Sequence, residues 1–135
     1  MMRFMLDTNI VSDMIRNPAG KAASAVLRVG DAAVCTSIVV ASELRYGCVK
    51  KRSAKLHKKV EELLAEIPVL PLDAPVDAEY GAIRAELEGR GQTIGQNDLF
   101  IAAHARALGT TLVTANTGEF NRIKGLKVEN WLVSA

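Results

Sequence analysis

The stretch "FMLDTNIVSD", residues 4–13, decides how this chain folds, because an apolar run ends abruptly on a carboxylate. The apolar half predicts a short buried strand, and Asp7 follows it directly. Asp7 could cap the helix that comes next, a role open equally to Thr8 or Asn9. The alternative is that Asp7 belongs to a polar site where the strand ends.

Composition places the 135 residues among globular proteins, with 49% hydrophobic and 24% charged residues. We expect a single domain over residues 1–135. No apolar run is long enough for a membrane span, and the N-terminus lacks the apolar region of a signal peptide, so we expect a cytoplasmic protein without membrane contacts. A net charge of +2 does not decide for or against nucleic-acid binding.

Short strands and helices alternate along the chain. Strands are expected at Arg3–Leu6, Ala33–Thr36, Val69–Leu72, Thr111–Thr114 and Lys127–Trp131. Helices are expected at Asn9–Arg16, Lys21–Val29, Ser37–Val49 and Lys55–Glu66, from an N-cap at Asp73 to about Glu88, and at Asp98–Leu108 with Gly109 as C-cap. This order predicts an α/β fold of three layers, with a mostly parallel sheet of about five strands and helices on both faces.

Ligands of such sheets bind beyond the carboxyl ends of the strands, so we looked for further polar residues that could meet Asp7 there. Glu43 projects from the largely apolar face of its predicted helix, and Asp98 shares a face with apolar residues one turn later. Taken singly, Glu43 could be exposed or paired with Arg45, and Asp98 could be the N-cap or a first-turn acid favoured by the helix dipole. Three acids on faces that should be buried point to a common site.

Carboxylates that converge in a partly dry pocket repel one another, and a divalent cation relieves that repulsion. Oxygen ligands without paired Cys or His favour Mg²⁺, with Mn²⁺ as a substitute. Cys35 and Cys48 have no metal-ligand spacing and are read as buried free thiols. His57 and His104 are read as solvated or structural. The stretch "TLVTANTGEF" adds polar groups that could reach the same edge, although its acid could equally belong to the first turn of a short helix: Thr114, Asn116 and Glu119.

Four stretches, in this order, resemble the motifs of PIN-domain ribonucleases: "FMLDTNIVSD", "SIVVASELRYG", "IGQNDLFIAAHA" and "LVTANTGEF". The resemblance extends through "GLKVENW" and covers essentially the whole chain. Within the family, the chain is most similar to VapC-type toxins of bacterial toxin–antitoxin pairs. Its ending resembles the branch whose members cut the anticodon loop of initiator tRNA.

The resemblance implies Mg²⁺-dependent hydrolysis of RNA phosphodiester bonds that leaves 5′-phosphate and 3′-hydroxyl ends. Asp7, Glu43 and Asp98 would form the acidic metal site. Asn116 stands where many PIN domains have a fourth aspartate, and Glu119 is the acid that the most similar branch uses nearby. The remaining motif residues would support the acids or contact phosphate: Thr8, Asn9, Asn97 and Thr114.

The densest basic stretch is "KKRSAKLHKK", residues 50–59. It could be a solvated helix face balanced by Glu61 and Glu62, or a path for the RNA backbone. The residues assigned to the RNA-binding patch are Lys50, Lys51, Arg52 and Lys55. The resemblance also implies a cognate VapB-like antitoxin that inhibits the enzyme in a hetero-oligomer, and a homodimer of the toxin.

Two other functions remain open at this point. A PIN-like scaffold that binds RNA or protein without cutting would fit the asparagine at position 116. A haloacid-dehalogenase-like phosphatase also ends its first strand on an aspartate, but needs a second aspartate where this chain has Asn9.

Overall fold

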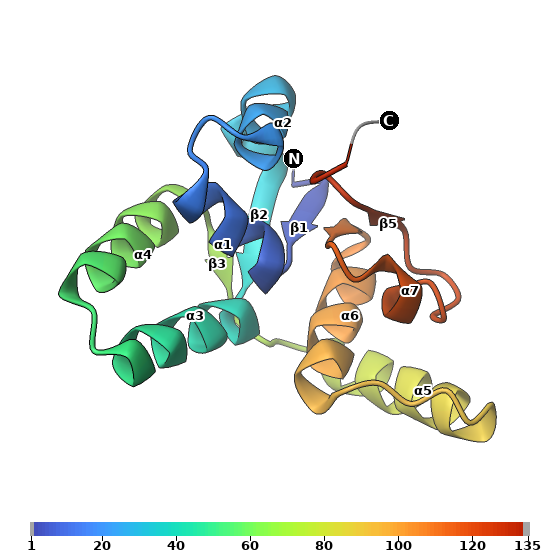
Figure 1. The fold of residues 1–135 in the computed structure, drawn as a ribbon. Helices are drawn as coiled ribbons and strands as arrows, with labels where there is room; N and C mark the ends of the chain where they lie inside the picture. Colours follow the sequence, from blue (N-terminus) through green and yellow to red (C-terminus); the bar gives the residue numbers. More distant parts are fainter. Residues whose placement is uncertain (1, 134–135) are drawn as a thin grey trace.

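The central strand of the fold is the one predicted from the opening stretch. In the computed structural model, which describes residues 2–133, β1 (Phe4–Leu6) pairs in parallel with β2 (Val34–Ser37) on one side and β4 (Thr111–Val113) on the other. The short edge strands β3 (Val69–Leu70) and β5 (Val128–Glu129) complete the order β3-β2-β1-β4-β5 (Figure 1). All described pairings are parallel, so the carboxyl ends of the strands meet at one edge of the sheet.

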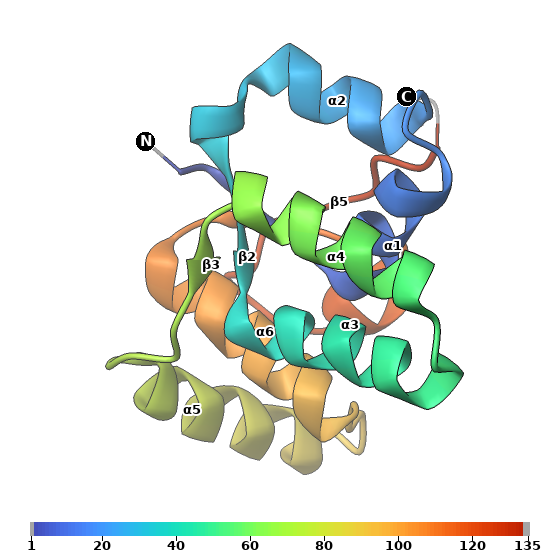
Figure 2. The same ribbon diagram turned by 90° about the vertical axis from the view of Figure 1, so that its left-hand side faces the viewer.

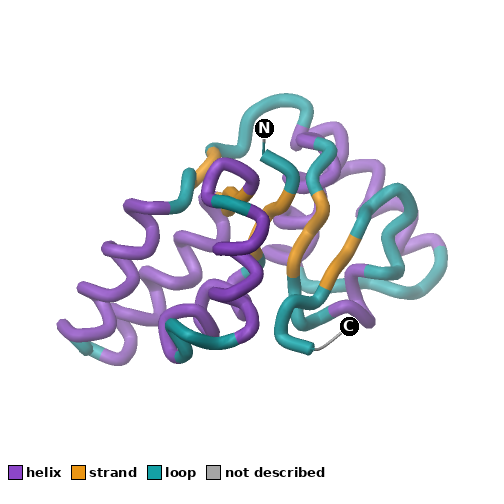
Figure 3. The backbone as a smooth tube through the Cα atoms, turned by 90° about the horizontal axis from the view of Figure 1, so that it is seen from above, coloured by secondary structure: helices purple, strands orange, loops and turns teal. Residues whose placement is uncertain are grey.

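Helices connect the strands and lie on both sides of them (Figure 3). The first four contact one another as a group, whereas α5 packs mainly against α6, and α6 also contacts α3. In Figures 1 and 2, α3, α5 and the beginning of α6 lie in the lower part of the molecule. The bounds are α1 Thr8–Arg16, α2 Lys21–Val29, α3 Ile38–Lys51, α4 Ala54–Glu66, α5 Val76–Gly89, α6 Gln96–Leu108 and α7 Thr117–Phe120.

The core lies between the sheet and these helices. Met5 and Leu6 of β1 and Leu112 of β4 are fully buried, as expected for strands covered on both faces. Cys35 and Cys48 are buried and unpaired, which confirms their reading as free thiols. None of the helices in residues 2–133 has the length and apolar character needed to cross a membrane.

Several predicted boundaries were wrong, for local reasons. Asp73 does not cap α5: Pro75 occupies the N-cap position, and Asp73 contributes only its backbone carbonyl, which accepts from Val76 N at 2.9 Å. The third strand ends at Leu70 because Pro71 has no N–H to donate to a sheet. The predicted C-cap was correct, since Gly109 adopts the left-handed conformation with φ of 70°.

Three elements begin or end elsewhere than predicted, with consequences for the site. The second strand starts at Val34, after a 3₁₀ turn at Asp31–Ala33, and continues to Ser37, which then caps α3. The last strand is limited to the two residues that pair with β4. Because α6 begins at Gln96 with Gly95 as N-cap, Asp98 lies inside the first turn and is not the cap.

Candidate active site

Asp7 stands at the carboxyl end of β1 and is only 4% exposed. It caps α1, because its Oδ1 accepts from Thr8 N at 2.8 Å. Its Oδ2 accepts from Thr114 Oγ1 at 2.7 Å and from Asn9 Nδ2 at 3.3 Å. Burial raises the pKa of Asp7 and the nearby Glu43 raises it further, while these hydrogen bonds oppose the shift. The capping role and the site role proposed for Asp7 are therefore compatible.

Thr114 and Asn9 join the ends of β1 and β4 around this carboxylate. Thr114 is fully buried, and its Oγ1 accepts from Asn116 N at 3.0 Å and from Asn9 Nδ2 at 3.4 Å. Asn9 also accepts from Ala115 N at 2.9 Å through its Oδ1. Since both the nitrogen and the oxygen of its amide are hydrogen-bonded, Asn9 holds the loop after β4. An amide cannot serve as the general acid that a phosphatase of the haloacid-dehalogenase type needs at this position.

Glu43 is brought to Asp7 by the way α3 starts. Ser37 Oγ accepts from Val39 N at 3.1 Å and lies 2.8 Å from Nδ1 of the buried His104, which ties the beginning of α3 to α6. Thr8 Oγ1 donates to Glu43 Oε1 at 2.7 Å. Thr8 thus bonds to Asp7 through its backbone and to Glu43 through its side chain, and so links the two acids.

The predicted alternative partner of Glu43 is engaged elsewhere. Arg45 Nε and Nη2 donate to the two carboxylate oxygens of Glu61 at 2.9 and 3.0 Å. Arg45 therefore does not neutralise Glu43, and the acidic character of the site is preserved.

Asp98 and Glu119 come from the opposite side of the site. The pKa of Asp98 is raised to about 6, first by burial and then by the charges of Asp7, Glu119 and Glu43. A hydrogen bond with Glu119 raises it further, and one of the two acids must carry a proton to make that bond. Glu119 also lies in the first turn of the short helix α7. It is therefore both a first-turn acid and a neighbour of Asp98.

Four acids from different parts of the chain thus interact at the carboxyl edge of the sheet. Their all-oxygen chemistry and their mutual repulsion fit a hard divalent cation. Their spacing is wider than that of a closed metal site: in residues 2–133, no three His, Cys, Asp or Glu side chains are close enough together to hold an ion as they stand.

The other predicted site residues differ in how close the structure brings them to the acids. Asn116 has its backbone in the Thr114 network, and its side chain does not cap α7. Asn97 is exposed on the first turn of α6, and no hydrogen bond of its side chain to the acids is found in residues 2–133. The basic patch lies at the end of α3 and the start of α4, with all of its side chains exposed: Lys50, Lys51, Arg52 and Lys55.

One basic residue was missed by the sequence analysis. Arg16, in the last turn of α1, lines the same pocket as Lys51, Thr8 and Glu43. Neither Arg16 nor Lys51 forms an ion pair within residues 2–133. Arg16 lacked any motif that could have identified it, because its relation to Lys51 depends on how α1 packs against α3. The pocket thus joins the basic patch to the acids.

The chain was then compared with known proteins. Residues 4–126 match the PIN domain model. A Shigella flexneri protein named tRNA(fMet)-specific endonuclease VapC is 41% identical over 133 residues, which cover 97% of this chain and 99% of that protein. Ribonuclease VapC2 of Rickettsia felis is 39% identical over 132 residues, which cover 96% of this chain and 98% of that protein.

Solved structures give the same picture. A chain of the Rickettsia felis VapBC2 complex, bound to a DNA fragment from its promoter, superposes with a TM-score of 0.90 at 36% identity, covering 96% of this chain and 99% of that chain. A chain of the DNA-bound VapBC complex of Salmonella typhimurium gives a TM-score of 0.87 at 34% identity, covering 97% and 99%.

Proposed function

The chain belongs to the PIN domain family, and from that premise we propose that it is a VapC-type endoribonuclease toxin that depends on a divalent metal ion. The observation that carries the proposal is the convergence of Asp7, Glu43, Asp98 and Glu119 at one edge of the sheet, where none of them forms an ion pair with a basic side chain of residues 2–133. We treat residues 1–135 as one PIN domain that acts as a unit.

Asp7, Glu43 and Asp98 are the residues that would hold the metal ion, with Glu119 beside Asp98. We propose Mg²⁺ as the natural ion and Mn²⁺ as a substitute, because hard carboxylate oxygens form the whole donor set. When bound, such an ion supplies an activated water and a positive charge at the scissile phosphate. Hydrolysis of this kind leaves 5′-phosphate and 3′-hydroxyl ends.

The neighbouring side chains have supporting roles in this proposal. Thr8, Asn9 and Thr114 hold the Asp7 carboxylate in one orientation through the hydrogen bonds described above. Burial and the neighbouring acids raise the pKa of Asp98 to about 6, and a cation held there would favour its ionised form.

RNA is proposed to approach from the side of α1 and α3. Arg16 and Lys51 line the same pocket as Glu43 and form no ion pair with the described residues, so they can attract backbone phosphate that the acids would repel. The relatives from Shigella flexneri and Salmonella typhimurium are named tRNA(fMet)-specific endonucleases, which favours initiator tRNA as the substrate. We propose the anticodon loop as the place of the cut, because unpaired bases are accessible there.

A VapB-like antitoxin is the proposed protein partner, since the similar solved chains come from VapBC complexes. We propose that the toxin is a homodimer inside a larger complex with this antitoxin. Tyr46 and Val49 of α3 are 64% and 74% exposed and are available for pairing between copies. Because tRNA is the proposed substrate, we propose that the protein acts in the cytoplasm.

The decisive experiment is cleavage of end-labelled initiator tRNA by the purified protein during a Mg²⁺ titration, with Asp98→Asn as the inactive comparison. Metal-dependent cutting at one anticodon position, with 5′-phosphate and 3′-hydroxyl ends, is expected for the wild type only. Binding of tRNA without cutting at any Mg²⁺ or Mn²⁺ concentration would favour the non-catalytic scaffold. Equal cutting by Asp98→Asn would place the activity elsewhere.

A further inference from the structure

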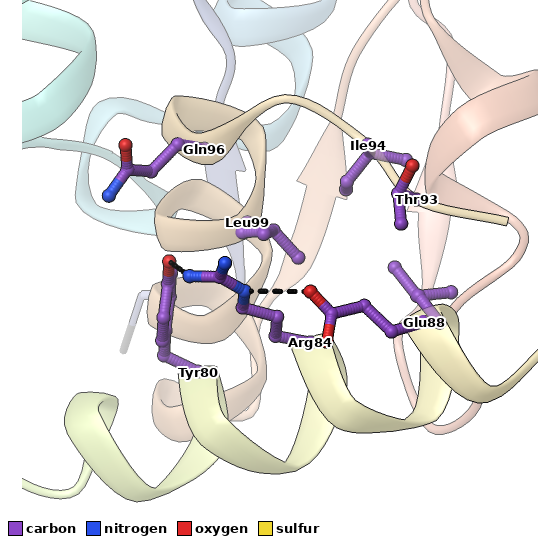
Figure 4. A pocket seen from close by; sticks show the side chains of 8 residues that line it. Tyr80, Arg84, Glu88, Thr93, Ile94, Gln96 and Leu99 are labelled. Carbon is purple, nitrogen blue, oxygen red and sulfur yellow. Dashed lines mark hydrogen bonds and ion pairs between the residues drawn. The ribbon is translucent and has the colours of Figure 1, made fainter. Parts of the chain in front are cut away.

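A pocket between α5 and α6 has no part in the function proposed so far (Figure 4). It encloses about 200 Å³. Its floor is apolar, made by Leu87 and Leu99, which are 2% and 6% exposed, together with Ile94. Polar groups of Glu88 and Gln96 stand at its rim. An apolar floor with few hydrogen-bonding groups at the edge suits one aromatic heterocycle.

Arg84 presents a flat surface at this pocket. Its Nε donates to Glu88 Oε2 at 3.1 Å, and its Nη1 donates to Tyr80 OH at 3.1 Å. Both bonds lie at the edges of the guanidinium group, so they fix its plane and leave its faces available for stacking. Figure 4 shows the guanidinium between these two partners, on the α5 side of the pocket.

The aromatic ring of Tyr80, beside Arg84, already stacks on another ring of the protein. Tyr80 stacks on Phe100, with ring centroids 4.3 Å apart and planes inclined by 22°. Tyr80 therefore contributes its hydroxyl group to the pocket, and Arg84 is the group left to stack. Unpaired RNA bases are commonly bound by stacking on the guanidinium planes of arginines and by hydrogen bonds to their edges.

The pocket lies next to one of the four acids, Asp98. Leu99 follows Asp98 in the chain, and a Cβ built on Gly95 would be 3.9 Å from Asp98 Oδ2. Both chain neighbours of Gly95, Ile94 and Gln96, line the pocket. A nucleotide with its phosphate at the acids can thus place a neighbouring base between α5 and α6.

We propose that the α5–α6 pocket binds one unpaired nucleobase of the RNA substrate, adjacent to the cleaved phosphodiester, with Arg84 stacked on the base. This inference rests on the proposed ribonuclease function. It assigns Arg84 a role in substrate binding and positioning, and no part in the bond-breaking step.

The test combines substrate and protein changes, starting from the RNA hairpin in which the cut is mapped. An abasic residue is placed at each position around the cut, and kcat/KM is measured for the wild type, Arg84→Lys and Arg45→Lys. Lysine keeps the positive charge but lacks the planar guanidinium group on which a base could stack. Arg45→Lys is the matched control, because Arg45 is also exposed and bonded to a glutamate, on α3 outside the pocket.

For the wild type, one abasic position should lower kcat/KM by about fivefold to a hundredfold, the value of one stacked base. Arg84→Lys should lower kcat/KM on the intact hairpin and lose most of this abasic penalty, whereas Arg45→Lys should keep it. The same penalty in Arg84→Lys as in the wild type, or no penalty at any position, would overturn the base pocket.

A binding measurement separates this inference from the proposed function. 2-Aminopurine at the sensitive position, in a hairpin bound to the inactive Asp98→Asn protein, should change its fluorescence on binding, and the change should diminish when Arg84→Lys is added. If the hairpin is cut but 2-aminopurine does not respond, the pocket assignment is wrong and the ribonuclease function stands. If no RNA is cut at all, the proposed function itself fails.

Discussion

The two aspartates of the site have opposite surroundings. Asp7 receives hydrogen bonds from Thr8, Asn9 and Thr114, which oppose the effect of its burial. Burial, and then the charges of the other acids, raise the pKa of Asp98 to about 6. Hydrogen bonds therefore hold the carboxylate on the β1 side of the site, whereas on the α6–α7 side the main neighbours of Asp98 are other carboxylates, which repel it. The difference teaches that an aspartate can be held by hydrogen bonds at one position of a site and repelled by neighbouring carboxylates at another.

The largest expected effect is that of Asp7→Ala. Cleavage should fall by about a hundredfold to a thousandfold, the usual cost of losing one electrostatic group from an active site. Three donors would lose their buried acceptor, so the free energy of unfolding should also fall by about 2 kcal/mol. Urea unfolding and tRNA cleavage measure both quantities. Asp13→Ala, on the same helix but bonded only to the exposed Asn17, is the control, and an equal effect there would contradict the comparison.

Asp98→Asn should separate activity from stability. Cleavage should fall by about a hundredfold or more, but the metal-free protein should become more stable by about 1 kcal/mol, after allowance for solvent screening, because a charge that is partly buried and repelled by other acids is removed. Calorimetry without metal measures the stability, and added Mg²⁺ should then stabilise the wild type more than the variant. A loss of stability in the metal-free variant would mean that Asp98 is not repelled in this way.

Thr114→Val removes the hydroxyl group that donates to Asp7 while leaving the volume of the side chain nearly unchanged. Loss of the hydroxyl should raise the pKa of Asp7 further and weaken Mg²⁺ binding by about tenfold, as other groups that orient metal ligands do. Titration calorimetry with Mg²⁺ measures this change. Thr36→Val is the matched control, because Thr36 is equally buried and its hydroxyl donates to a backbone carbonyl, Leu6 O at 2.7 Å, and not to a carboxylate. Both variants should lose stability, but only Thr114→Val should lose affinity for the metal.

The smallest effect concerns pH and His104, which holds the start of α3 from within the core. Burial lowers the pKa of His104 below 6.5, against the smaller opposite effects of Asp73 and the Pro71 carbonyl. The unfolded chain therefore binds a proton more readily, and stability should fall as pH drops below 6.5, by at most about 1.4 kcal/mol per pH unit. Urea unfolding from pH 8 to 5 should show a smaller decline for His104→Gln, and an identical decline would exclude His104 as its source.

Much of this architecture could be predicted because it is written in local patterns. The apolar run before Asp7, the alternation of strands with helices and the glycine after α6 each depend on residues close together in the chain. Boundaries that depend on hydrogen bonds were less accurate, as at Asp73 and Asp98, since several nearby residues can occupy a cap position.

The sequence by itself determined the fold class and pointed to Asp7, Glu43 and Asp98, because capping or solvent exposure can explain each acid singly but not three acids on faces that should be buried. Only the tertiary structure decided that Arg45 pairs with Glu61, that Arg16 stands beside Lys51, and that Asp98 meets Glu119. It also placed Arg84 at a pocket next to Asp98. The physical reason is that periodicity encodes which face of an element is buried, whereas the partner on that face depends on how distant elements pack.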